Sequence, residues 1–505
     1  MSDVDVDIVN ASEGAGGDKL PRSVVKVATV VVLGTIMAIL DTTIVAVALD
    51  TLAKDFHVSV STIQWVTTGY LLALAVVIPV SGWAVHRLGA KPVYIGSLVL
   101  FVLGSVLCGL AWSATALIVF RVLQGVGGGM IMPVGQTIMA QSAGPNRMSR
   151  VMALIGIPTL LGPILGPVVG GAIVTNFSWR WIFFVNVPIG IAAIIAAVRL
   201  LPKSTKDREH RFDLWGFLML SPGLALLVYG LSQVGERGGF SSPTVLWSVL
   251  LGVVLIVGFV FRSLRAPEPL MDMGLFKRRN FSIASISIFL VGATLYAGMF
   301  LLPLYYQIVR GESPWVAGLL LAPQGIGAAL VMTFAAKLSD KYGPRAVVPL
   351  GMILLAAGTL VYTQVSATSS YVVLTLALFV RGVGLGFGMM PVFAASYRGL
   401  RHDEVPRAST STNILRQVGG SIGVAITAMV LQTQINSRFP HAGGKGLAGV
   451  GAVHLPPSVL ESLAGAFATS FWWAFGMCAL AIVPALFLPA KPAELADEDT
   501  PVILD

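Results

Sequence analysis

The chain has 505 residues, of which 55% are hydrophobic and only 11% are charged, and its formal net charge is +9. So few charged residues leave too little polar surface to solvate soluble domains of this total size. The basic residues lie in clusters between apolar runs, which indicates a role in membrane orientation and argues against a nucleic-acid partner. Cys108 and Cys478 each lie within an apolar run, which excludes a disulfide framework or a cysteine-rich metal site.

Apolar runs of about 20 residues, each long enough to cross a hydrocarbon core, recur from Val24 almost to the C-terminus. They predict an all-α polytopic membrane protein, because a membrane β-barrel would show short alternating segments instead. We place about fourteen spans at residues 24–49, 62–84, 92–112, 115–140, 150–175, 180–201, 213–233, 244–264, 281–307, 315–336, 345–365, 371–397, 407–432 and 466–490.

Most Lys and Arg residues lie in loops on one side of these spans, and the positive-inside rule makes that side cytoplasmic. An even number of spans places both termini there. The first twenty residues are acidic and polar, so they lack the basic start and apolar core of a signal peptide. We therefore expect a multi-pass protein of the bacterial inner (plasma) membrane, with a disordered cytosolic tail at 1–23 and a cytosolic tail at 491–505.

An internal repeat divides the membrane part. Gly82–Lys91, between the second and third spans, matches Ala336–Arg345, and Arg121–Pro133 similarly echoes Arg381–Pro391. The repeat predicts two pseudo-repeated six-helix bundles at 24–201 and 281–490, with two extra transmembrane helices and their linkers at 202–280. Such halves are typical of transporters that rock about a central site.

Five further segments appear in a specific order: Leu40–Leu49, Gln64–Tyr70, Gly162–Gly171, Trp179–Gly190 and Asn413–Gly423. With them, the chain resembles the major facilitator superfamily, specifically its fourteen-helix drug:proton antiporter branch. The resemblance implies the major facilitator fold, and an antiporter motif of Gly162, Pro163, Gly166, Pro167, Gly170 and Gly171. It also implies gating loops that contain Gly82, His86, Arg87, Gly89, Lys91, Asp340, Lys341, Gly343 and Arg345.

The chain departs from the branch pattern at several positions. Ala46 and Asp50 stand where the branch usually has Asn and Pro. His86 occupies the acidic position of the first gating loop, whereas the second copy keeps its acid as Asp340. An acid at this position would attract basic residues, whereas a protonated His86 is positively charged and would repel them.

Asp41 is the acidic residue that lies deep within a predicted span, where a charge needs a partner or a wet cavity. At 1.5 Å per residue, Asp41 lies about 10 Å below the outer end of the first span, and Arg121 lies about 9 Å below the outer end of the fourth. These depths are similar, so contact is possible. One interpretation is a static ion pair. The other is proton coupling, in which changes in solvation move Asp41 between holding and releasing a proton, and the resemblance implies this role for the first-helix acid and the fourth-helix Arg.

Glycines recur every four residues at Gly162, Gly166 and Gly170, which gives the fifth span one smooth face. This face would seal or hinge the two halves, or it is ordinary membrane-helix packing. Pro163 and Pro167 predict kinks.

Arg381 and Arg416 lie about 14 Å into their spans without an acidic partner at that depth. They would satisfy backbone carbonyls, line water, or bind an anionic substrate or lipid headgroup. Together with them, aromatic, Met and amide residues are candidates for the lining of a substrate cavity. These are Trp65, Tyr70, Gln124, Met132, Gln136, Phe300, Tyr305, Gln324, Met389, Phe393, Asn413 and Gln417.

The sequence has no phosphate-binding loop of the G-x-x-x-x-G-K-[ST] type and no cluster with metal-ligand spacing, so we expect no cofactor and no enzymatic activity. The leading hypothesis is a multidrug efflux antiporter, driven by the proton gradient, that exports amphiphilic or cationic small molecules. Its partners would be these substrates, protons and membrane lipids, without nucleic acid. A dedicated exporter of an endogenous lipid or anionic metabolite is an alternative, as is a non-transporting membrane receptor or assembly protein.

Overall fold

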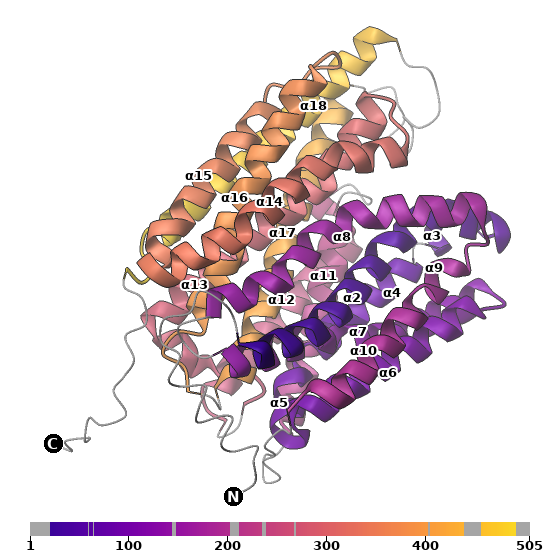
Figure 1. Ribbon diagram of the computed structural model, residues 1–505. Helices are drawn as coiled ribbons and strands as arrows, with labels where there is room; N and C mark the ends of the chain where they lie inside the picture. The colour runs from indigo at the N-terminus through magenta and orange to yellow at the C-terminus, as the bar shows by residue number, and fades with distance from the viewer. Residues whose placement is uncertain are drawn as a thin grey trace, which may run out of the picture.

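The computed structural model describes residues 21–58, 60–63, 65–143, 148–202, 212–234, 239–266, 269–401, 404–438 and 456–490. Within these ranges the chain forms helices and no strands, which confirms the predicted all-α class (Figure 1).

The N-terminal half consists of α2 (Arg22–Asp55), α3 (Val60–Ile63), α4 (Trp65–Val77), α5 (Val80–Leu88), α6 (Ala90–Gly109), α7 (Ala114–Ala143), α8 (Met148–Asn176), α9 (Trp181–Phe184) and α10 (Asn186–Leu200). The C-terminal half consists of α13 (Arg279–Leu304), the π-helical turn η4 (Tyr305–Val309), α14 (Pro314–Tyr342), α15 (Pro344–Tyr362), α16 (Tyr371–Ser396), α17 (Val405–Arg438) and α18 (Pro457–Ala485). Between the halves lie α11 (Leu214–Ser232), the short η2 (Gly239–Ser241), α12 (Pro243–Ser263) and the short η3 (Met273–Lys277).

Helices occupy all fourteen ranges that were predicted as spans. In the described part of the chain, twelve are individually long and apolar enough to cross a membrane, and α4 with α5, which bends by 54°, makes a thirteenth. The predicted fifth span corresponds to α8, whose 29 residues are also long enough to cross, at about 1.5 Å per residue.

Two predicted spans differ from the structure more than the others. The second is broken into α4 and α5, because the chain bends next to Pro79. The last predicted span, 466–490, begins too late, since α18 starts at Pro457. The first turns of α18 contain Ser458, Glu461 and Ser462, so they were not recognised as part of an apolar run. Glu461 is held there by a hydrogen bond from the backbone N–H of Ala367 in a neighbouring loop (2.9 Å).

The two halves repeat the same packing. Helix α2 packs against α8 and α10, and α13 packs in the same way against α17 and α18. Helix α7 packs against α4 and α6, as α16 does against α14 and α15. The two gating loops also share a backbone conformation that favours glycine, with φ of 89° at Gly89 and 86° at Gly343. These features support the internal repeat that the sequence indicated.

The structure corrects one detail of that repeat, the proposed match between Arg121 and Arg381. Gly104 of α6 lies against Gln124, and the equivalent Gly358 of α15 lies against Arg381. Arg381 therefore occupies the position of Gln124 and not that of Arg121, one helical turn away. The short Gly-rich motifs of α7 and α16 align over their glycines while their arginines are offset.

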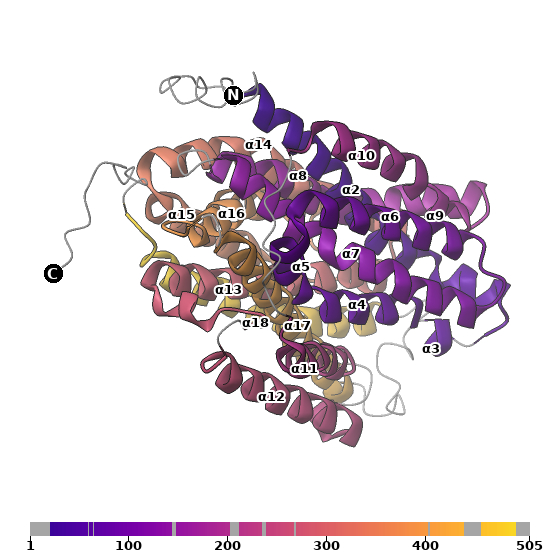
Figure 2. The same cartoon turned by 90° about the horizontal axis from the view of Figure 1, so that it is seen from below.

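The halves meet along two seams. At one seam α8 packs directly against α14 and α16, and at the other α17 packs against α5 and α7. Helix α11 contacts both α4 and α17, and its partner α12 lies outside it (Figure 2). The two helices between the halves therefore cover the second seam, and no described helix pair covers the first in the same way.

The apolar core shows which ends of the halves are joined. Val24 near the start of α2 and Leu488 just after α18 belong to one buried cluster that contains residues of both halves. We call this end of the bundle the chain-terminal end. At the opposite end, each half has a separate apolar cluster, one around Phe183 and the other around Phe467.

Polar contacts also join the halves at the chain-terminal end. Arg150 of α8 forms an ion pair with Asp340 of α14 (Nε to Oδ2, 3.4 Å), and both side chains are largely buried. At the other seam, the hydroxyls of Ser81 in α5 and Thr410 in α17 lie 3.0 Å apart. In this structure the halves are therefore closed against each other at the chain-terminal end.

We predict that Asp340→Asn weakens this closure, because the amide has no charge to pair with Arg150. The expected effect is a shift of about two- to fivefold toward conformations in which the chain-terminal end is open. Spin labels placed across the α8–α14 seam would report the shift as a longer distance. Asp55→Asn is the control, since Asp55 pairs with Arg180 at the opposite end with 50% of its side chain exposed. Unchanged distances in Asp340→Asn would contradict the prediction.

Candidate functional site

Asp41 and Arg121 form a fully buried ion pair inside the N-terminal half. Nη1 of Arg121 donates to Oδ2 of Asp41 at 2.6 Å, and both side chains are 0% exposed. The similar depths of the two residues in the first and fourth spans indicated that this contact is possible. An ionised carboxylate inside a membrane helix bundle needs such a partner.

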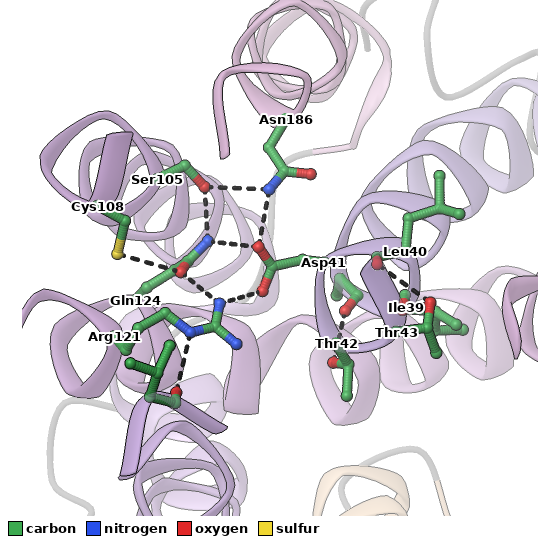
Figure 3. A network of polar contacts seen from close by, with 12 residues as sticks. Ile39, Leu40, Asp41, Thr42, Thr43, Ser105, Cys108, Arg121, Gln124 and Asn186 are labelled. Atoms are coloured by element: carbon green, nitrogen blue, oxygen red, sulfur yellow. Dashed lines mark hydrogen bonds and ion pairs between the residues drawn. The ribbon is translucent and has the colours of Figure 1, made fainter. Parts of the chain in front are cut away.

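Neutral side chains complete the coordination of the carboxylate (Figure 3). Oδ1 of Asp41 accepts hydrogen bonds from the amides of Gln124 in α7 and Asn186 in α10, each at 2.9 Å. Both amides also donate to the hydroxyl of Ser105 in α6, at 2.6 Å and 3.3 Å. Four helices thus contribute to one network around Asp41.

The network differs from the sequence-based prediction at Gln124, which was expected in the substrate cavity but contacts Asp41. Asn186 and Ser105 were not predicted as site residues. The signal for Asn186 was its place in the motif Trp179–Gly190, whereas a single Ser in an apolar span carries no comparable signal.

Tyr70 closes the network on the side of α4. The guanidinium carbon of Arg121 lies 4.1 Å from the centre of the Tyr70 ring, a cation–π geometry. Nε of Arg121 donates to the backbone oxygen of Val66 at 3.2 Å. Nη2 of Arg121 has no hydrogen-bond partner in the described part of the chain, so the aromatic ring is an important neighbour of this buried charge.

The smooth glycine face of α8 packs against α2, the helix that carries Asp41. A Cβ atom at Gly162 would overlap Ile39, and one at Gly166 would overlap Thr43. At Gly170 a Cβ would lie 3.1 Å from the backbone oxygen of Ile44. These three glycines therefore allow close packing within the N-terminal half, so in this structure they do not seal the two halves, and a hinge role for them stays a prediction.

Other residues of the predicted antiporter motif are placed differently. A Cβ at Gly171 would lie 3.9 Å from Trp315 of α14, so this glycine faces the other half. Pro163 and Pro167 fall within α8, but their side chains lie outside the described residues.

A cavity lies between the halves, beside the Asp41 network. It contains about 930 Å³ of space between atoms, counting the part that is open to solvent. Of the residues predicted to line a cavity, the structure places five here: Tyr70, Met132, Asn413, Arg416 and Gln417. Thr42 and Thr43, the neighbours of Asp41 on α2, also line it, whereas the Asp41 carboxylate points away toward α7 and α10 (Figure 3).

Contacts between the halves close the cavity toward the chain-terminal end. The amide of Asn413, which lines the cavity, donates to Oε1 of Gln136 at 2.6 Å. One turn further along, the hydroxyl of Ser409 donates to the backbone oxygen of Pro133 at 2.8 Å. Gln136, predicted as a lining residue, thus belongs to the layer that closes the cavity.

The other predicted cavity residues lie outside this cavity. Trp65 is 42% exposed and stacks on Tyr229 of α11 at 6.0 Å. Met389 and Phe393 are buried in the apolar cluster that joins the halves. Phe300 and Tyr305 belong to the separate cluster of the C-terminal half.

Arg381 is buried among neutral acceptors of the C-terminal half. It donates to Thr359 Oγ1 (3.1 Å), Gln324 Oε1 (2.8 Å) and the backbone oxygen of Thr294 (3.3 Å). Arg381 and Gln324, both predicted to line the cavity, therefore bind each other instead.

The gating-loop residues lie at the chain-terminal end. Lys91 donates from Nζ to the backbone oxygens of Val198 (2.8 Å) and Leu201 (2.6 Å), which anchors the end of α10. In the second copy, the backbone N–H of Arg345 donates to Pro489 (3.3 Å), just after α18.

The remaining gating-loop residues lie on α5 and α14. A Cβ at Gly82 would lie 3.0 Å from Thr410 of α17. His86 and Arg87 are half-buried in the last turn of α5, and Lys341 lies over the ring of Tyr342 at 5.2 Å.

Comparison with known proteins identifies the family. The model of the Major Facilitator Superfamily matches residues 31–424. The chain belongs to this superfamily. It is 38% identical over 496 residues to the "Multidrug resistance protein B homolog" of Mycobacterium tuberculosis (strain ATCC 25618 / H37Rv), which covers 94% of this chain and 92% of that protein.

A second relative is the MFS-type transporter YhcA of Bacillus subtilis (strain 168), at 32% identity over 430 residues, or 85% of this chain and 81% of that protein. Among solved structures, the proton:xylose symporter XylE superposes with a TM-score of 0.61 at 14% identity, over 91% of this chain and 94% of that one. This last likeness concerns the fold alone. The family match and the transporter relatives make the protein a multi-pass membrane transporter and not an enzyme.

We predict that Gly166→Ala destabilises the transporter by about 1–3 kcal/mol, because the added methyl group would overlap Thr43 where α8 meets α2. Thermal unfolding of the purified protein would measure the loss. The matched control is Gly96→Ala in α6, where a Cβ would meet nothing within 4 Å. The prediction is contradicted if both variants unfold at the wild-type temperature.

We also predict that Asn186→Ala costs about 1–3 kcal/mol, since the Asp41 carboxylate loses one of its buried donors. The same unfolding measurement applies. Asn176→Ala serves as the control, because the exposed amide of Asn176 bonds only to Ala172 of its own helix among the contacts described. Equal losses in the two variants would show that the Asp41 network contributes no specific stability.

Proposed function

We propose that this protein is a proton-coupled antiporter that exports amphiphilic small molecules by alternating access. The observation that carries the proposal is the buried ion pair of Asp41 and Arg121, which lies directly behind the wall of the cavity between the halves. A membrane-embedded acid with this placement is a natural carrier of the exchanged proton.

The network can exist in two charge states. With Asp41 ionised, its charge is balanced by Arg121 and its oxygens are occupied by the amides of Gln124 and Asn186. Protonation would remove the negative charge and leave the Arg121 guanidinium without its counter-ion. The ion pair would then lose most of its attraction, and the helices that hold it would be free to adopt another arrangement.

Proton access must change during the cycle, because Asp41 is 0% exposed in this conformation. The halves are closed at the chain-terminal end, where α2 begins and the basic gating loops lie. By the positive-inside rule this end is cytoplasmic. We therefore assign this conformation to the side of the cycle that faces outward, with both termini in the cytoplasm.

Tyr70 provides a physical link between substrate and proton sites. It lines the cavity, and its ring lies over the Arg121 guanidinium. A substrate that displaces this ring would remove the cation–π contact of Arg121 and so change the strength of its ion pair with Asp41. Such shared contacts can make substrate binding and proton binding interdependent.

Two observations support amphiphilic substrates. The cavity combines apolar side chains such as Leu71, Leu74 and Met299 with a few polar groups, which suits molecules with an apolar body and one polar group. In addition, a relative at 38% identity is named as a multidrug resistance protein. Bacterial inner-membrane localisation and the proton gradient as the energy source belong to the same proposal.

The test is proton flux in proteoliposomes. We predict that Asp41→Asn abolishes substrate-driven proton movement while the protein still inserts and binds substrate, because the amide preserves shape but cannot exchange a proton. Asp55→Asn is the control and should retain flux, because Asp55 is the last residue of α2 and lies outside the Asp41 network. Wild-type flux in Asp41→Asn would contradict the assignment of Asp41 as the proton carrier.

A further inference from the structure

The charge of the cavity comes from one side chain, Arg416 of α17. Among the described residues that line the cavity, Arg416 carries a charge and the others are neutral. Asp41 cannot offset this charge directly, since its carboxylate is fully buried and bound to Arg121 on the other side of α2.

Arg416 is also poorly satisfied compared with the other arginines inside the bundle. Its Nη atoms lie 3.4 Å from the hydroxyl of Tyr296 and 3.4 Å from Oδ1 of Asn413, both at the long limit of a hydrogen bond. Its buried Nε has no hydrogen-bond partner among the described residues. By contrast, Arg121 binds Asp41 at 2.6 Å.

Arg416 is half-buried, and its shielded Nε without an acceptor is costly unless a ligand supplies acceptor atoms. The fork of an arginine matches the oxygens of carboxylate, sulfonate and phosphate groups, and such charge-assisted bonds are strong. Tyr296 and Gln417, which line the same cavity, carry further donors in a hydroxyl and an amide. On its other walls, Leu74, Met132 and Leu295 offer apolar surface.

We propose that the cavity binds amphiphilic organic anions, with the acidic group on Arg416 and the apolar body against the aliphatic and Met side chains. This inference rests on the proposed function and specifies its substrate class. It replaces the cationic substrates that the sequence suggested, because a cation would meet Arg416 and no acid among the described lining residues. The shared chemistry fits either a water-soluble organic acid or an anionic lipid.

The test is equilibrium binding to the full-length protein in phosphatidylcholine nanodiscs, with three probes that share one apolar body. Pyrenebutyrate is the anion, pyrenebutanol the neutral analogue and pyrenebutyl-trimethylammonium the cation. We expect the anion to bind about tenfold or more tightly than the cation. Arg416→Gln should remove this preference, and Arg416→Lys should retain part of it.

Arg199→Gln is the matched control, since it removes one positive charge from an exposed position at the end of α10. It should leave the anion preference intact. Binding of pyrenebutanol to Arg416→Gln would show that the variant still folds and keeps its cavity. An anion preference that survives in Arg416→Gln, or a wild-type preference for the cation, would overturn the inference.

Two further measurements separate the remaining possibilities. Nanodiscs that contain phosphatidic acid distinguish the source of the anion: competition with pyrenebutyrate supports a lipid, and undisturbed binding supports a soluble acid. Proton flux separates this inference from the proposed function. Anion binding without anion-driven flux would retain the site and refute the antiporter, whereas flux driven only by the cation would retain the antiporter and refute the anion site.

Discussion

An ionised carboxylate in the membrane interior must be neutralised and hydrogen-bonded, and the N-terminal half is organised around this requirement. Asp41 on α2 forms an ion pair with Arg121 of α7 and accepts hydrogen bonds from the amides of Gln124 in α7 and Asn186 in α10. Both amides also donate to the hydroxyl of Ser105 in α6, which fixes their orientation. The glycines of α8 allow a further helix to pack closely on α2 beside this network. Packing and polar contacts therefore fix the position of one side chain from several directions.

The C-terminal half has the same architecture, but α13, which corresponds to α2, carries no Asp or Glu. At the position of Gln124 it carries Arg381, which binds neutral acceptors on its neighbours. The contact with Thr359 repeats the contact between Gln124 and Ser105 on equivalent helices. The two halves thus share a packing scheme but differ in chemistry. Proton exchange is proposed for the N-terminal half, and Arg416 of the C-terminal half supplies the charge of the cavity.

The helices, the internal repeat and the possible contact between Asp41 and Arg121 could be predicted from the sequence. The membrane constrains the length of each span, the side on which basic loops lie and the depth of a residue within its span, and all three can be read from the order of the residues. Which face of a span meets which neighbour was harder to predict, since apolar residues face lipid and protein alike. Trp65 and Gln124 were both assigned to the cavity, yet one stacks on α11 and the other binds Asp41. The glycine face of α8 was recognised, but its partner helix could not be inferred from spacing.

Arg416 and the Asp41–Arg121 pair also determine which step of the proposed cycle responds to the membrane potential. With Asp41 ionised, the pair is neutral, and an organic anion on Arg416 would cancel the remaining charge, so the loaded transporter changes conformation with little net charge in its core. After release and protonation, Arg121 and Arg416 would both be unbalanced. A potential of 100 mV acts on each such charge with up to about 2.3 kcal/mol. An inside-negative voltage would therefore accelerate the return of the empty, protonated transporter, while the export step itself would be almost insensitive to voltage.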